Sequence, residues 1–111
     1  MGNLIENSCE ACTLSAPQAT QEEINEFMVQ LSDWEIVELE GIRRLNRVFN
    51  FNNFIDALSF TNRIGALAET ENHHPALLTE WGKVTVSWWT HKIKGLHVND
   101  FVMAAKTDTV L

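Results

Sequence analysis

The chain has 111 residues, of which 45% are hydrophobic and 21% are charged, and its formal net charge at pH 7 is −7. This length and composition are typical of one soluble globular domain. The acidic balance disfavours a protein that binds nucleic acid or an anionic membrane surface, because both partners require a basic face.

The sequence contains no apolar run near the roughly 20 residues of a transmembrane helix. Its first residues lack the basic and apolar regions of a signal peptide, so we expect a cytoplasmic protein. Residues 1–19 show no periodicity and predict an extended or flexible N-terminal arm ahead of a single domain at residues 20–111. The arm contains Cys9 and Cys12. This lone pair could be half of a zinc site, a redox pair or two reduced thiols, and the last is favoured because no second Cys pair exists.

The first predicted elements are a helix and a hairpin. Thr20 and Glu23 form a capping-box pattern, and apolar residues at helical spacing predict a helix from about Gln21 to Leu31. Residues 34–39 and 42–51 alternate in polarity around a Glu40-Gly41 turn and predict an antiparallel hairpin.

A longer second helix is predicted to follow, with Asn50 or Asn52 as its N-cap and its end near residues 69–71. Its apolar stripe is wide, so we expect burial against a sheet. The stripe consists of Phe54, Ala57, Leu58, Thr61, Ile64, Gly65 and Ala68, and it is widened beyond one face by Ile55, Phe60 and Leu67.

Residues 76–81 and 84–91 complete the predicted strands, with a Gly82-Lys83 turn between them. Alternation should place Val84, Val86, Trp88 and Thr90 on one face and Trp89 and His91 on the other. A loop at residues 92–96 leads to a last helix that starts at Val98 or Asn99. The order α-β-β-α-β-β-α predicts an α+β fold in which helices cover one face of a four-stranded, antiparallel-rich sheet. An uncovered face or edge strand would favour oligomers.

Three of the four histidines fall close to candidate element ends, at His73-His74-Pro75 and Thr90-His91. Pro75 fixes its own φ and pushes His74 toward an extended conformation. Imidazoles titrate near neutrality, so such a cluster can hold both an acid and a base at pH 7. Trp81 and Trp89 border this cluster in sequence and could form walls for a flat heteroaromatic ligand, although Trp more commonly packs in a core.

Other interpretations remain open for each residue. The histidine pair could be a polar turn, His91 a strand end and Asp100 only a helix start. Three histidines and an aspartate are a legitimate metal ligand set, but neighbouring side chains in an extended segment point apart, and no H-x-x-x-H spacing is present. No Ser lies in a G-x-S-x-G setting. We therefore favour proton transfer by imidazoles, without a metal.

These residues together resemble the pterin-4a-carbinolamine dehydratase family, in its bacterial type. The resemblance covers about residues 20–111 and is carried by Glu69, His73-His74-Pro75, Trp81, Lys83-Val84, Thr90-His91, Gly95-Leu96 and Asp100. It implies a four-stranded antiparallel sheet with three helices on one face, in dimers or tetramers. It also implies dehydration of a 4a-hydroxytetrahydropterin to quinonoid dihydropterin and water, without a cofactor. This reaction recycles the tetrahydrobiopterin-type cofactor of aromatic amino-acid hydroxylases, such as phenylalanine hydroxylase.

The resemblance assigns catalysis to His73, His74 and His91, with Asp100 in support. It assigns substrate binding to Glu69, Asn72, Pro75, Trp89, Thr90 and Lys92. The chain departs from the family at Asn72, where Asp is common, at Trp89, where a smaller residue stands, and at His97, where Ser or Thr often begins the last helix. Some relatives are instead protein-interaction modules that stabilise a transcription-factor dimer. A non-catalytic pterin-binding or interaction module is therefore the alternative.

Overall fold

The computed structural model describes residue 4 and residues 17–111. The elements, in chain order, are α1 (Gln21–Met28), β1 (Glu35–Leu39), β2 (Ile42–Asn50), α2 (Phe54–Glu71), β3 (Ala76–Glu80), β4 (Lys83–Trp88), the 3₁₀ turn η2 (His91–Ile93) and α3 (Val98–Thr109). The predicted order of helices and strands is thus confirmed. Within the described ranges, no helix has both the length and the apolar character to cross a bilayer.

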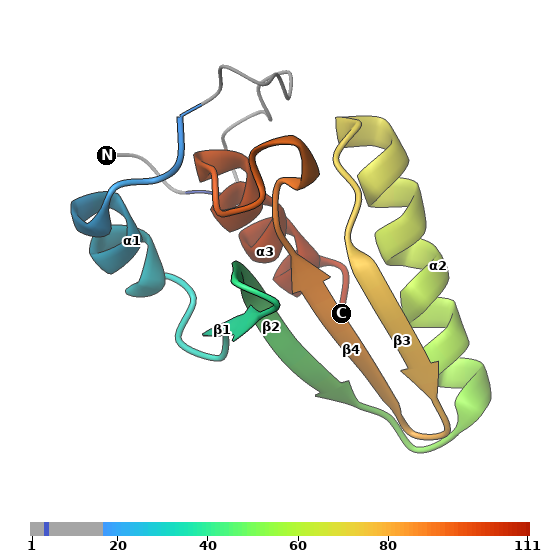
Figure 1. Cartoon of the computed structure of the whole chain (residues 1–111). Helices are drawn as coiled ribbons and strands as arrows, with labels where there is room; N and C mark the ends of the chain where they lie inside the picture. The colour runs from blue at the N-terminus through green and yellow to red at the C-terminus, as the bar shows by residue number, and fades with distance from the viewer. Residues whose placement is uncertain (1–3, 5–16) are drawn as a thin grey trace.

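The four strands form one sheet in the order β1-β2-β4-β3, and every neighbouring pair is antiparallel. Helix α2 packs against β3 and β4, whereas α3 packs against β2 and β4 (Figure 1). Every second residue of β2 and β4 turns toward these helices, as pleating requires. The buried residues of this face include Leu45, Phe49, Val84, Val86 and Trp88. The predicted α+β fold with helices on one face is therefore confirmed.

Helix α1 begins as predicted but ends sooner. The Thr20 hydroxyl accepts from the Glu23 N–H, and the Glu23 carboxylate accepts from the Thr20 N–H, at 3.1 and 2.9 Å. The helix closes at Met28 because the N–H groups of Gln30 and Leu31 bond to carbonyls only three residues back. Leu31 is still fully buried, which explains why its apolar character extended the predicted helix.

The cap and the buried face of α2 differ from the prediction. Asn53 is the N-cap, and its side-chain oxygen accepts from the Asp56 N–H at 2.8 Å. Phe60 belongs to the buried line because its ring packs 4.6 Å from that of Phe49. As a result Leu58, predicted to face the sheet, is 42% exposed. The residues of α2 that are buried are Ala57, Phe60, Ile64 and Ala68.

Part of the chain ahead of α1 packs onto the domain. Leu4 is fully buried, and its N–H donates to the Gln30 side-chain oxygen at 3.1 Å. The Ala19 N–H donates to the Leu96 carbonyl at 2.7 Å. The Cys9 and Cys12 pair lies outside the described residues.

Candidate active site

The end of α2 sets the first part of the site. Asn72 caps the helix in the left-handed conformation, with φ of 52°, which Asn adopts more readily than most residues. The following His73 N–H donates to the Ala68 carbonyl at 3.1 Å. This turn buries His73, which is 3% exposed, and leaves the next residue, His74, at the surface. One turn therefore directs the two adjacent imidazoles into different environments.

The Asp100 carboxylate joins three segments of the chain. It is fully buried in the first turn of α3. Its Oδ1 lies 2.7 Å from His73 Nε2, and its Oδ2 accepts from the Thr90 hydroxyl at 2.8 Å and from the His97 N–H at 2.9 Å. An ionised carboxylate only accepts, so the His73 ring donates its Nε2–H to it. Charge-assisted bonds of this kind are stronger than neutral ones.

Stacking on an aromatic ring also fixes the position of the His73 ring. The ring stacks on Trp88, with centroids 5.8 Å apart and planes only 10° from parallel. The Trp88 indole N–H in turn donates to the Thr107 hydroxyl at 3.1 Å. Because both partners are buried, His73 is held as part of the core rather than as a mobile surface group.

His74 and Glu69 form the second imidazole–carboxylate pair. His74 Nε2 and Glu69 Oε2 are in hydrogen-bond contact, and their side chains are 53% and 78% exposed. Glu69 lies in the last turn of α2, so the helix end supplies both members of this pair. A carboxylate bonded to one ring nitrogen fixes the orientation of an imidazole.

His91 belongs to the segment that follows β4, the strand that pairs with β3. It opens η2 just after β4, and its exposed ring stacks on Trp89 with centroids 4.4 Å apart. Lys92 beside it is exposed as well, whereas Thr90 is 1% exposed. Thr90 thus lies beneath the surface, where it bonds to Asp100.

The structure does not bring every candidate together. Trp81, considered as a wall of the site, lies in the turn between β3 and β4, at the end of these strands away from His74 and His91 (Figure 1). Asn72 is exposed, and Pro75, just before β3, is half-buried.

One supporting residue, Trp88, was missed by the sequence reasoning. Trp88 was placed only on one face of the predicted strand, and the structure shows that the His73 ring stacks on it. His97 is the N-cap of α3, and its Nδ1 accepts from the Asn99 N–H at 3.0 Å. The sequence had already marked His97 as standing where Ser or Thr often begins the last helix. Its backbone N–H bonds to Asp100 at position N3, which completes a capping box.

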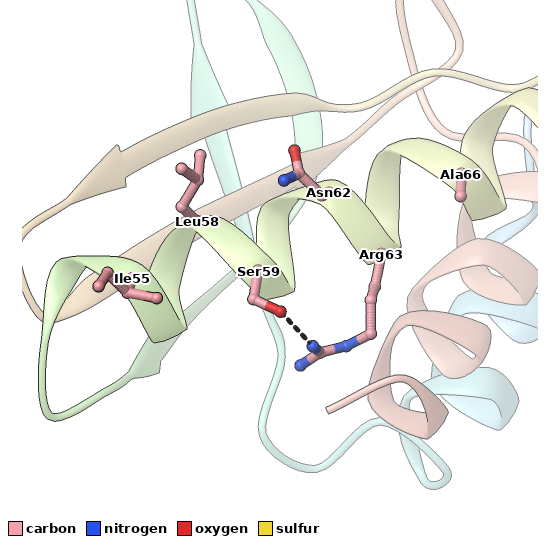
Figure 2. A pocket seen from close by; sticks show the side chains of 6 residues that line it. All are labelled: Ile55, Leu58, Ser59, Asn62, Arg63 and Ala66. Atoms are coloured by element: carbon pink, nitrogen blue, oxygen red, sulfur yellow. Dashed lines mark hydrogen bonds between the residues drawn. The ribbon is translucent and has the colours of Figure 1, made fainter.

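No metal cluster marks the site in the part of the chain that is described. Among residue 4 and residues 17–111, no three His, Cys, Asp or Glu side chains are grouped to hold a metal ion. A surface pocket is found elsewhere, on the outer face of α2, and no histidine lines it (Figure 2). It is lined by Ile55, Leu58, Ser59, Asn62, Arg63 and Ala66.

The fold and site define a small α+β domain in which histidine–carboxylate pairs gather where α2, β4 and α3 meet. The family described as Pterin 4 alpha carbinolamine dehydratase matches residues 17–110, and the chain belongs to this family. It is 60% identical over 111 residues to a protein of Syntrophotalea carbinolica named "Putative pterin-4-alpha-carbinolamine dehydratase", covering all of this chain and 99% of the relative. A protein of Nitrosococcus oceani with the same name is also 60% identical, covering all of this chain and 98% of the relative.

Solved structures agree on the fold. A transcriptional coactivator/pterin dehydratase from Brucella melitensis superposes with a TM-score of 0.75 at 29% identity, covering 85% of this chain and 98% of the other. A pterin dehydratase-like protein identified as a RuBisCO assembly factor in the alpha-carboxysome gives a TM-score of 0.59 at 18% identity, covering 70% and 88%. The second likeness concerns the fold alone.

Proposed function

We propose that this protein dehydrates a 4a-hydroxytetrahydropterin to quinonoid dihydropterin and water by histidine acid–base catalysis. Its membership of the dehydratase family and its 60% identity to two named relatives support the reaction. In the cell, this activity would return the tetrahydrobiopterin-type cofactor to aromatic amino-acid hydroxylases. A cytoplasmic location remains a prediction from the sequence.

The observation that carries the proposal is the shared carboxylate of Asp100. Its two oxygens bind His73 and Thr90, which are 17 residues apart in the chain. Each of these buried residues is the immediate neighbour of an exposed histidine, His74 or His91. Because consecutive Cα atoms are only about 3.8 Å apart, one carboxylate holds both histidine-bearing segments at the same end of the β3–β4 pair.

In the proposed mechanism, each of the two exposed imidazoles transfers one proton. His74, protonated and steadied by Glu69, donates a proton to the hydroxyl on C4a, and the C4a–O bond breaks as water leaves. His91, neutral, takes the proton from N5 as the C4a=N5 double bond forms. His73 is buried beside Asp100, so it orients the pterin ring indirectly, by fixing the turn that carries His74. Positioned proton transfer of this kind typically accelerates a reaction by about 10²–10⁴-fold.

The remaining candidate residues serve binding in this proposal. Trp89 lies beside His91 and would border the flat bicyclic ring, while its own ring stacks on the His91 imidazole. Lys92, Asn72 and Pro75 flank the histidines on the two converging segments. Thr90 acts on the substrate indirectly, by fixing the segment that carries His91.

The test is the rate of 4a-carbinolamine breakdown with and without the protein, in the presence of a metal chelator. We expect an acceleration that the chelator does not change. An acceleration lost on chelation would indicate a metal-dependent site, and no acceleration at all would contradict the proposed reaction.

The second candidate function is a non-catalytic interaction module, and the surface of α2 favours it. Ile55 and Leu58 are 78% and 42% exposed beside the pocket shown in Figure 2. The Arg63 guanidinium bonds to Ser59 at 2.8 Å and leaves this apolar strip uncovered. A protein that forms a stable complex through α2 but does not accelerate dehydration would fit this alternative.

We also propose that the protein is a homo-oligomer and that the same face of α2 takes part in its assembly. Exposed apolar residues about one helical turn apart, such as Ile55 and Leu58, are typical of helix–helix contacts. The variant Ile55→Glu should reduce the mass measured by light scattering, whereas Glu26→Gln on the exposed face of α1 should not. An unchanged mass for Ile55→Glu would exclude α2 from the interface.

A further inference from the structure

Trp89 links the proposed site to an arginine of the neighbouring strand. Arg44 of β2 places its guanidinium carbon 4.1 Å from the centre of the Trp89 ring. The same ring stacks on His91, with centroids 4.4 Å apart and planes 14° from parallel. One indole is therefore in contact with both a cation and an imidazole proposed to transfer a proton.

The indole is the main partner of the Arg44 guanidinium. Arg44 Nε is buried and has no hydrogen-bond partner among the described residues. Its Nη2 donates to the Leu39 carbonyl over a long 3.5 Å. A buried donor without a partner is unfavourable, and a flexible arginine side chain normally turns such a group toward water. The cation–π contact with Trp89 offsets this cost, so stacking rather than hydrogen bonding sets the position of Arg44.

Among the described residues, the stack on Trp89 is the main contact of the His91 ring. It lies on the short η2 turn, where the Thr90 side chain makes no capping bond. Its side chain is exposed, and exposed side chains change rotamer within nanoseconds. Proton transfer requires the ring to lie within hydrogen-bond reach of the reacting atom. The stack on Trp89 is thus what orients the ring.

We propose that Arg44 is a positioning residue: it fixes Trp89, and Trp89 holds the His91 ring in the orientation that proton transfer requires. This inference rests on the proposed function of His91. Small displacements of a catalytic group lower the rate of the chemical step strongly. Arg44 should therefore affect kcat rather than the binding of substrate.

The test compares Arg44→Gln, Arg44→Lys and the control Arg43→Gln, whose side chain points to the other face of the sheet. We expect Arg44→Gln to lower kcat by about threefold to tenfold, with KM changed by less than about twofold. Arg44→Lys should recover part of the loss, because an ammonium group keeps a cation–π contact. A loss of similar size in Arg43→Gln, or none in Arg44→Gln, would overturn the proposal.

A second readout does not depend on activity. The ring current of Trp89 should shift the ring-proton NMR signals of His91, and Arg44→Gln should move these signals toward their positions in a free imidazole. Arg43→Gln should leave them in place. If the wild-type protein does not accelerate dehydration, the proposed function fails and the His91 signals alone decide. Unchanged signals in Arg44→Gln would refute the positioning role.

Discussion

Replacing Asp100 with Asn tests the bond network that joins the two histidine segments. The Asp100 Oδ2 receives two donors, from Thr90 and from the His97 backbone, so the Asn oxygen should take that position. Its NH₂ group then faces His73 Nε2, which must accept instead of donate. Three charge-assisted bonds become neutral, at a loss of about 1 kcal/mol each. The expected destabilisation is about 3 kcal/mol.

Urea denaturation measures this loss directly. With a slope near 1.5 kcal/mol/M, typical of a small domain, the midpoint should fall by about 2 M. Thr90→Val removes one of the three donors to the carboxylate and should cost about 2 kcal/mol, less than Asp100→Asn. Glu26→Gln, on the exposed face of α1, should stay within about 0.5 kcal/mol of wild type. If Asp100→Asn shifts the midpoint no more than Glu26→Gln, the carboxylate does not hold the segments together.

Three further predictions concern positions outside the histidine pairs. Burial raises the pKa of Asp108 above its ordinary value of 3.8, and this effect outweighs the hydrogen bonds from Trp34 and Arg47, which lower the pKa. The contribution of Asp108 to stability is therefore largest below pH 3.8 and is lost as the pH rises through the raised pKa. The stability of Asp108→Asn relative to the wild type, measured as the free energy of unfolding, should therefore be greater at pH 7 than at pH 3. The opposite change would contradict this. His97→Ala should be less stable than His97→Asn by about 1 kcal/mol in urea, because Asn can still cap α3, and equal stabilities would exclude the cap. Gly82→Ala should lower the thermal unfolding temperature more than Gly41→Ala. Both glycines have positive φ, but only at Gly82 would a Cβ meet a backbone atom, at 3.2 Å. The reverse order would refute this account.

Periodicity and turn chemistry were sufficient to predict most of the fold. The capping box at Thr20 and Glu23, the turn at Glu40-Gly41 and the alternation of β4 act over a few residues, so they can be read locally. The buried face of α2 could not be predicted in the same way. Phe60 is buried because it packs on Phe49 from another element, and no local pattern shows that contact.

The candidate site, too, could be predicted from the sequence only in part. The histidines and Asp100 were candidates because of their residue types and spacing. That one carboxylate binds both the His73 and Thr90 side chains depends on how α3 packs against β4. The contact between Arg44 and Trp89 likewise depends on strand order, because β2 and β4 are neighbours in the sheet but not in the chain.

The most direct test of the acid–base account is kcat/KM for 4a-carbinolamine dehydration in His74→Ala combined with His91→Ala. Both side chains are exposed, so the variant should keep the far-ultraviolet circular dichroism spectrum of the wild type. The account predicts a fall of at least about 10²-fold. A folded double variant with the wild-type kcat/KM would show that neither imidazole transfers a proton.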